Sequence, residues 1–142
     1  MVRLSLGYPG PAGEAEMLAT HEKGDRVVAL EPVADAADML AAQDAAMRVL
    51  ASEALRHYVV ALLGRTREDP RVELGASPRS GLLLLRAAKA RALLAGRDHA
   101  LPDDVQQMAD AVLSHRIVLA PEAVEASGSQ VVAAAVAATP AL

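Results

Sequence analysis

The sequence predicts a mainly α-helical protein, built as a small helical bundle. Hydrophobic residues make up 53% of the 142 residues, whereas aromatic residues make up only 1%. The core must therefore consist of Leu, Val, Met and Ala, and this composition favours closely packed helices over a sheet. Several segments also repeat apolar residues at the spacing of an amphipathic helix. A chain of this length can bury a core of its own as one domain.

The composition also argues against several kinds of protein. The sequence contains no cysteine, so a disulfide framework and a thiolate metal site are excluded, which fits a reducing compartment. A formal net charge of −4 argues against a general nucleic-acid surface. The uncharged apolar tract from Val131 to the end is shorter than the ~20 residues that cross a bilayer, and Pro140 interrupts it. We therefore expect a cytoplasmic chain without a membrane span.

The N-terminal part is expected to be the least regular. Residues 2–6 alternate apolar and polar side chains as a strand does, but the Gly- and Pro-rich residues 7–11 cannot continue it. A short helix is predicted over 11–21, because Glu14 and Glu16 lie in its early turns, where carboxylates are favoured. A second helix is predicted from about residue 34. The residues expected on one side of this second helix are Ala36, Met39, Leu40, Gln43 and Met47.

The two central helices have the clearest start and stop signals. One is capped by Ser52 and ends at Gly64, and a polar connection follows it. Its apolar residues at helical spacing are Leu55, Tyr58, Val59, Leu62 and Leu63. The next helix begins with Ser77 as its cap and Pro78 in its first turn, and it stops at Gly96.

The C-terminal part continues this helical pattern. A helix begins at Pro102 and carries Asp103 and Asp104 as charges in its first turn. The residues predicted on its apolar face are Val105, Met108, Ala109, Val112 and Leu113. A short strand is predicted around 116–119, and a last helix is predicted from Ser129, with that serine as its cap.

The sequence contains none of the common catalytic motifs. The chain has no G-x-x-x-x-G-K-[ST] loop, no G-x-S-x-G elbow and no H-E-x-x-H pair, and its histidines are scattered singly. Asp103 and Asp104 do not form a catalytic carboxylate pair, since adjacent residues do not face each other on a helix.

Arg79 lies at an unusual position, the N-terminal end of a predicted helix. A cation at a helix N-terminus costs roughly 0.3–1 kcal/mol unless something negative lies beside it. We expect Arg79 to point along the packed face of its helix, on the same side as Leu82, Leu83, Arg86, Ala90 and Leu93. One hypothesis is an ion pair with Glu73 or Asp69. The other is an anion site, made by the guanidinium and the free N–H groups of residues 76–79, that suits a nucleotide phosphate.

The stretch LGASPRSGLLLLRAAKARALLAGRDHALPDDVQQMADAVLSHRIVL resembles the sensor-2 helix and closing segment of the C-terminal lid in MoxR-type AAA+ ATPases. LGASPR is the most specific part, and it places the family's sensor-2 arginine at Arg79. The resemblance implies that Arg79, with Ser77, Pro78 and Arg86, contacts the nucleotide. VRLSLGYP is similar to the family's last core strand, which implies a core end and hinge over 1–11 and a helical lid over 12–142.

The same resemblance implies a function for the longer protein. That protein would bind ATP and Mg²⁺ and would couple hydrolysis to chaperone-like remodelling or cofactor insertion. Its partners would be the missing AAA+ core, neighbouring subunits of a ring and a von Willebrand A domain protein. Walker A, Walker B, sensor 1 and the arginine finger have no counterpart here, so we expect a piece that binds no nucleotide by itself and does not hydrolyse ATP alone. The alternative is a self-standing helical interaction module, similar to a histone fold, since LPDDV between helices is also a histone-type pattern.

Overall fold

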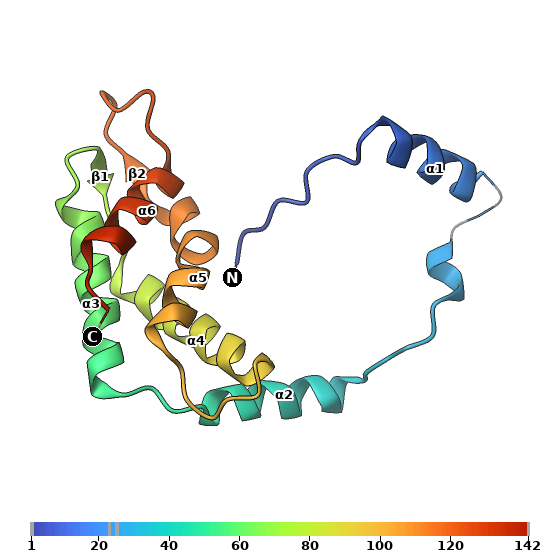
Figure 1. Ribbon diagram of the computed structural model, residues 1–142, viewed down its shortest axis with the longest axis horizontal. Coiled ribbons are helices and arrows are strands. Elements are labelled where there is room, and N and C mark those ends of the chain that lie inside the picture. The colour runs from blue at the N-terminus through green and yellow to red at the C-terminus, as the bar shows by residue number, and fades with distance from the viewer. Residues whose placement is uncertain (1, 23, 25, 142) are drawn as a thin grey trace.

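The computed structural model describes residues 2–22, 24 and 26–141 (Figure 1). Its elements in chain order are α1 (Pro11–His21), a 3₁₀ turn (Arg26–Ala29), α2 (Ala36–Arg48), α3 (Glu53–Glu68), β1 (Val72–Leu74), α4 (Pro78–Leu94), α5 (Pro102–Leu113), a 3₁₀ turn (Ser114–Arg116), β2 (Val118–Leu119) and α6 (Gly128–Ala138). This order confirms the mainly helical prediction.

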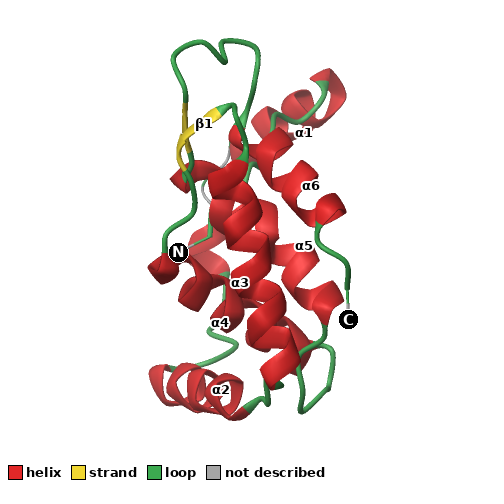
Figure 2. Cartoon of the chain, turned by 90° about the vertical axis from the view of Figure 1, so that its left-hand side faces the viewer, coloured by secondary structure: helices red, strands yellow, loops and turns green. Residues whose placement is uncertain are grey.

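Helices α3, α4, α5 and α6 pack around one hydrophobic core, and α2 lies across one end of them (Figures 1 and 2). Helix α4 contacts α2, α3 and α5, while α6 covers α3 and α5. The largest fully buried side chains are Leu62, Leu84, Leu113, Val105, Val112, Val131, Val132, Thr66 and Asp104. The apolar faces predicted for α3 and α5 are therefore confirmed, apart from Met108, which is half-buried.

The packed side of α4 differs from the predicted one. Its buried residues are Ser80, Gly81, Leu84, Ala88 and Ala92. The side that carries Arg79 and Arg86 faces solvent, and Leu82 between them is 62% exposed. The four consecutive leucines at 82–85 hide the period of this helix, so the small residues mark the packed side instead.

The predicted side of α2 is also wrong. Met39, Leu40 and Met47 are exposed, and the half-buried positions are Ala45 and Ala46. Helix α2 is attached to α4 partly through a hydrogen bond, in which Lys89 Nζ donates to the carbonyl oxygen of Met47 over 3.0 Å.

Several boundaries also move. Helix α3 continues through Gly64, so the polar connection after it is shorter than predicted. Helix α6 begins at Gly128 and is capped by Ser127, which accepts from Gln130 N–H over 3.2 Å and donates its own N–H to Gln130 Oε1 over 2.9 Å. Ser129 lies inside the helix, so its prediction as the cap is wrong. The stop at Gly96 is confirmed, because this glycine adopts a φ of +72° that other residues rarely adopt.

The strand prediction is half right. Residues 2–6 form no strand. The strands in the described part of the chain, β1 and β2, pair with each other and not with residues 2–6. Strand β2 confirms the prediction around 116–119, and it pairs antiparallel with β1, which the sequence analysis assigned to a loop. Three residues of β1 carry too little alternation to identify a strand.

The described residues between 2 and 35 form what we call the N-terminal arm. The beginning of the arm returns to the bundle, where Arg3 N–H donates to the carbonyl oxygen of Ala111 in α5 over 2.8 Å. Helix α1, confirmed at its predicted bounds, has no buried residue and lies well away from the bundle (Figure 1). The large apolar side chains exposed along the arm include Leu4, Leu6, Tyr8, Met17, Leu18, Val27, Val28, Leu30 and Val33. By contrast, Tyr58 in α3 is 2% exposed, and its hydroxyl accepts a hydrogen bond from Gln106 over 3.0 Å.

Candidate functional site

The candidate site begins with the first turn of α4. Ser77 is the N-cap, and its hydroxyl oxygen accepts from Ser80 N–H over 3.3 Å. Pro78 follows and Arg79 is the second residue of the helix. The first turn contains no acidic residue, so nothing within it compensates a cation at the positive end of the helix dipole.

Arg79 is exposed, and within the described residues its side chain has no hydrogen bond or ion pair. The predicted alternative, a pair with Asp69 or Glu73, is wrong. Asp69 is bound by Arg71, whose Nε and Nη2 donate to its two carboxylate oxygens over 2.9 and 2.7 Å. These hydrogen bonds hold the pKa of Asp69 below its usual range. Glu73 lies exposed in β1. The guanidinium of Arg79 therefore remains available to an external anion.

A groove of 300 Å³ runs between α3 and α4. Pro78, the residue before Arg79, lines this groove, whereas Arg79 itself does not. Its lining consists of Arg56, Val59, Val60, Leu63, Arg67, Pro78, Gly81, Leu82 and Leu85. Val60 and Leu82 are 63% and 62% exposed, so the groove presents apolar surface to solvent. Its only charged lining residues are arginines. A ligand with a flat apolar part and a negatively charged part would fit this combination.

The structure brings most of the predicted site residues together. Ser77, Pro78 and Arg79 share the first turn of α4, whereas Arg86 lies about two turns further along the same exposed side. Arg86 does not line the groove. Arg56 and Arg67 of α3 also line the groove, and neither was predicted as a site residue. Arg67 was missed because α3 was predicted to stop at Gly64, although a glycine inside a helix costs only about 1 kcal/mol.

A sequence profile described as the AAA lid domain matches residues 64–135. This range runs from the end of α3 through β1, α4, α5 and β2 into α6. The chain belongs to the AAA lid domain family. This confirms the resemblance to the lid of MoxR-type AAA+ ATPases.

Relatives of known sequence agree with this assignment. The lid is 39% identical to protein YeaC of Bacillus subtilis over 123 residues, which are 87% of this chain and 38% of YeaC. It is 32% identical to Chaperone MoxR1 of Mycobacterium tuberculosis over 128 residues, which are 84% of this chain and 33% of MoxR1. The matched part thus spans 38% and 33% of the length of these two relatives.

A solved structure supports the fold. The lid superimposes on the crystal structure of a candidate ATPase from Cytophaga hutchinsonii with a TM-score of 0.86 and 26% sequence identity. The match covers 100% of this chain and 46% of that protein. The arrangement of helices described above therefore also occurs within that longer chain.

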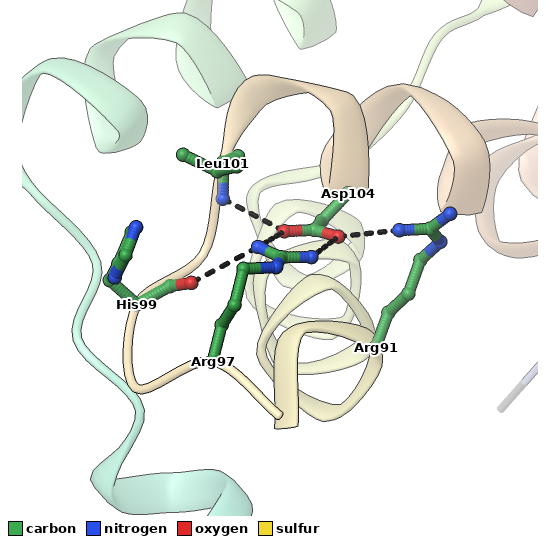
Figure 3. A network of polar contacts seen from close by, with 5 residues as sticks. All are labelled: Arg91, Arg97, His99, Leu101 and Asp104. Carbon is green, nitrogen blue, oxygen red and sulfur yellow. Dashed lines mark hydrogen bonds and ion pairs between the residues drawn. The ribbon is translucent and has the colours of Figure 1, made fainter. Parts of the chain in front are cut away.

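A buried carboxylate joins α4 to α5 within the lid (Figure 3). Asp104 is 0% exposed and accepts hydrogen bonds from Arg91 Nη1 over 2.6 Å and from Arg97 Nη1 and Nη2, each over 2.7 Å. It also accepts from Leu101 N–H over 2.9 Å, so it supplies the cap that Leu101 cannot provide. The Arg97 guanidinium, with help from Arg91, holds the pKa of Asp104 far below its usual range. The prediction of Asp104 as an ordinary first-turn charge is therefore incomplete, since it is an internal structural group.

The remaining polar groups offer no metal site. Among the described residues, no group of three or more His, Cys, Asp or Glu side chains is arranged to hold a metal ion. His115 has a buried Nδ1 without a hydrogen-bond partner in the described chain, and burial lowers the pKa of this histidine.

No helix in the described residues combines the length and apolar character needed to span a bilayer.

Proposed function

We propose that the lid serves a MoxR-type AAA+ ATPase and that Arg79 is its sensor-2 residue, which binds a phosphate of the nucleotide. The observation that carries this proposal is an exposed arginine in the first turn of α4 with no acidic partner in the described chain. The first turn adds the backbone N–H of Arg79 and the positive end of the helix dipole. The prediction of free N–H groups over 76–79 is wrong at two of these positions, because the Ala76 N–H is bound by Thr66 and Pro78 has no N–H. An arginine kept in this unfavourable position is best explained by an external anion.

The groove between α3 and α4 favours a nucleotide over a simple inorganic anion as the ligand. Pro78 and Leu82 offer apolar surface to a flat base, while Arg79 offers a planar fork to a phosphate. Arg86 and the cap Ser77 are proposed to complete the lid side of the site. ATP and Mg²⁺ are assigned to the longer protein, in which Arg79 would stabilise negative charge that develops on the transferring phosphoryl group.

The N-terminal arm is evidence for a neighbouring core domain in the longer protein. The large apolar side chains described in the arm are exposed, as expected of a segment whose packing partner is another domain. We propose that residues 1–11 are the end of that core and that residues 7–11 are the hinge. Gly7, with a φ of +66°, gives this hinge a conformation that other residues rarely adopt. The exposed α1 extends the proposed contact with the core beyond the hinge.

The wider role is proposed from the relatives. One relative is named a chaperone, which supports chaperone-like remodelling or cofactor insertion by the longer protein. The partners that we propose are the core, neighbouring subunits of a ring and a von Willebrand A domain protein, all in the cytoplasm. The family assignment favours this function over a self-standing module of the histone type.

Replacement of Arg79 tests the proposal. In the longer ATPase, Arg79→Ala should slow ATP turnover by roughly 10²- to 10³-fold, because a guanidinium that stabilises transferring phosphate is worth orders of magnitude. In the lid alone, the same change should leave the free energy of unfolding unchanged or raise it by a few tenths of a kcal/mol. The control is Arg65→Ala, which removes an exposed α3 arginine that pairs with Glu68. Turnover that is equally fast in both variants would exclude the sensor-2 role.

A further inference from the structure

The loop that leads into α4 is fastened to the last turn of α3. Thr66 is 0% exposed, and its hydroxyl oxygen accepts a hydrogen bond from Ala76 N–H over 3.0 Å. The same hydroxyl donates to the carbonyl oxygen of Leu63 over 2.7 Å. Arg67 Nε donates to the carbonyl oxygen of Ala76 over 2.9 Å. Both backbone polar groups of the buried Ala76 are thus bound by adjacent residues of α3.

Steric contacts reinforce this attachment. A Cβ atom on Gly75 would lie 2.7 Å from Arg67 Cγ and 2.8 Å from the carbonyl oxygen of Thr66, so only glycine allows the loop to approach α3 this closely. Beyond Arg79, a Cβ atom on Gly81 would lie 2.6 Å from Leu63 Cδ1. The backbone is therefore held against α3 on both sides of Arg79.

We infer that Thr66 and Arg67 are positioning residues, which fix the backbone that carries Arg79 and so place its guanidinium for the nucleotide phosphate. This inference rests on the proposed function of Arg79. Because no described side chain holds the Arg79 guanidinium, its location depends on its backbone. That backbone is set by the bonds from Thr66 and Arg67 to Ala76, three residues earlier. Catalytic groups lose much of their effect when they are displaced by as little as 1 Å.

A purely structural role would make a different prediction. Loss of the Thr66 hydroxyl leaves a buried N–H without a partner, which destabilises any protein. A structural residue would therefore lower the melting temperature without a specific effect on catalysis. A positioning residue would lower kcat in protein that is still folded, and only while Arg79 is present.

The lid provides a matched control for this distinction. Thr139 in the α6 C-cap is 5% exposed, and its hydroxyl donates to the carbonyl oxygen of Ala135 over 2.7 Å, much as Thr66 donates to Leu63. Thr139 lies outside the loop and the groove. Thr66→Val and Thr139→Val therefore each remove one buried hydroxyl, but only the first releases Ala76.

The experiment measures kcat and KM for ATP in the longer ATPase, below the melting temperature of every variant. Thr66→Val should lower kcat by roughly 10- to 100-fold, whereas Thr139→Val should leave it within about twofold. Thr66→Ser retains the hydroxyl and should restore most of the loss. In an Arg79→Ala background, Thr66→Val should cause no further loss of kcat, because the two residues act as one unit.

The outcomes separate the two claims. If Arg79→Ala lowers kcat and Thr66→Val does not, the inference is wrong and the proposed function stands. If Thr66→Val lowers kcat equally in the Arg79→Ala background, Thr66 acts elsewhere and the inference is again wrong. If Arg79→Ala has no effect, the proposed function fails and the inference fails with it. Gly75→Ala, which pushes the loop from α3, replaces Thr66→Val in the same cycle if that variant does not fold.

Discussion

Asp104 shows how differently two adjacent carboxylates can behave. Asp104 is fully buried and bound by Arg91, Arg97 and a backbone N–H, whereas its neighbour Asp103 is exposed. The two arginines keep part of their surface in water, at 40% and 26% exposed, so their own desolvation is incomplete. The carboxylate therefore gains three partners at the cost of burying one charge fully.

Removal of this charge should destabilise the lid strongly. Asp104→Asn is expected to lower the free energy of unfolding by roughly 2–4 kcal/mol, because it removes the negative charge that two arginines bind and replaces one of the two acceptor oxygens with an NH2 donor. Urea denaturation of the chain measures this loss. The control is Asp103→Asn on the same turn, which should change the stability by less than about 0.5 kcal/mol. Similar losses in the two variants would contradict the structural role of Asp104.

The difference in stability between the wild type and Asp104→Asn should depend on pH. The pKa of Asp104 is lower in the folded chain than the value of about 3.9 that an unfolded aspartate has. Its stabilisation is therefore complete above about pH 5 and decreases as the pH falls below the unfolded pKa. The gap between wild type and Asp104→Asn should shrink by up to about 1.4 kcal/mol per pH unit below about pH 4. His115 titrates in both proteins and cancels, so a gap that stays constant down to pH 2 would argue against this origin.

At the scale of helices, caps and stops were predictable where one residue decides them. Ser52, Ser77 and Gly96 act locally, and the sequence identifies their roles correctly. Helix faces were predictable only where apolar and polar residues alternate cleanly, as in α3 and α5. In α4 and α2, alanines and runs of leucine fit more than one face, and the choice depends on which neighbour packs there.

Two glycines in the bundle should respond oppositely to alanine. A Cβ atom on Gly64 within α3 would meet no atom within 4 Å, so Gly64→Ala should stabilise the lid by about 0.5–1 kcal/mol through helix propensity. A Cβ atom on Gly128 would lie 2.2 Å from the carbonyl oxygen of Ser114, so Gly128→Ala should destabilise it by about 1–3 kcal/mol. Thermal melts followed by circular dichroism measure both. A stabilising Gly128→Ala would show that α6 is free to move away from Ser114.

At the scale of the whole molecule, the chain divides into a packed bundle and the N-terminal arm. The family and the position of Arg79 in the first turn of α4 could be predicted from the LGASPR stretch, whereas the prediction that Arg79 lies on the packed side was wrong. The groove between α3 and α4 and the binding of Ala76 by Thr66 could not be predicted, because they depend on contacts between α3 and the loop before α4. The spacing of residues within one helix does not indicate which atoms of a neighbouring helix or loop will contact it.

The arm should contribute little to the stability of the bundle. A chain that begins at Ala34 should keep its free energy of unfolding within about 1.5 kcal/mol, because the arm adds no buried side chain from α1 and one backbone hydrogen bond from Arg3. Urea denaturation followed by far-UV circular dichroism tests this. The control removes residues 127–142 instead, which takes Val131, Val132 and Ala135 from the bundle and should unfold it. A large loss on removal of the arm would mean that it packs on the bundle.

The two tyrosines give this division an optical consequence. Tyr8 is 96% exposed in the arm, Tyr58 is 2% exposed in α3, and the sequence contains no tryptophan to mask their emission. Each part of the molecule therefore carries one fluorophore of its own. After Tyr8→Phe, the remaining emission reports the environment of Tyr58 and its hydrogen bond to Gln106, while quenching by a small solute in the unmodified chain reports the shielding of Tyr8 when another domain covers the arm.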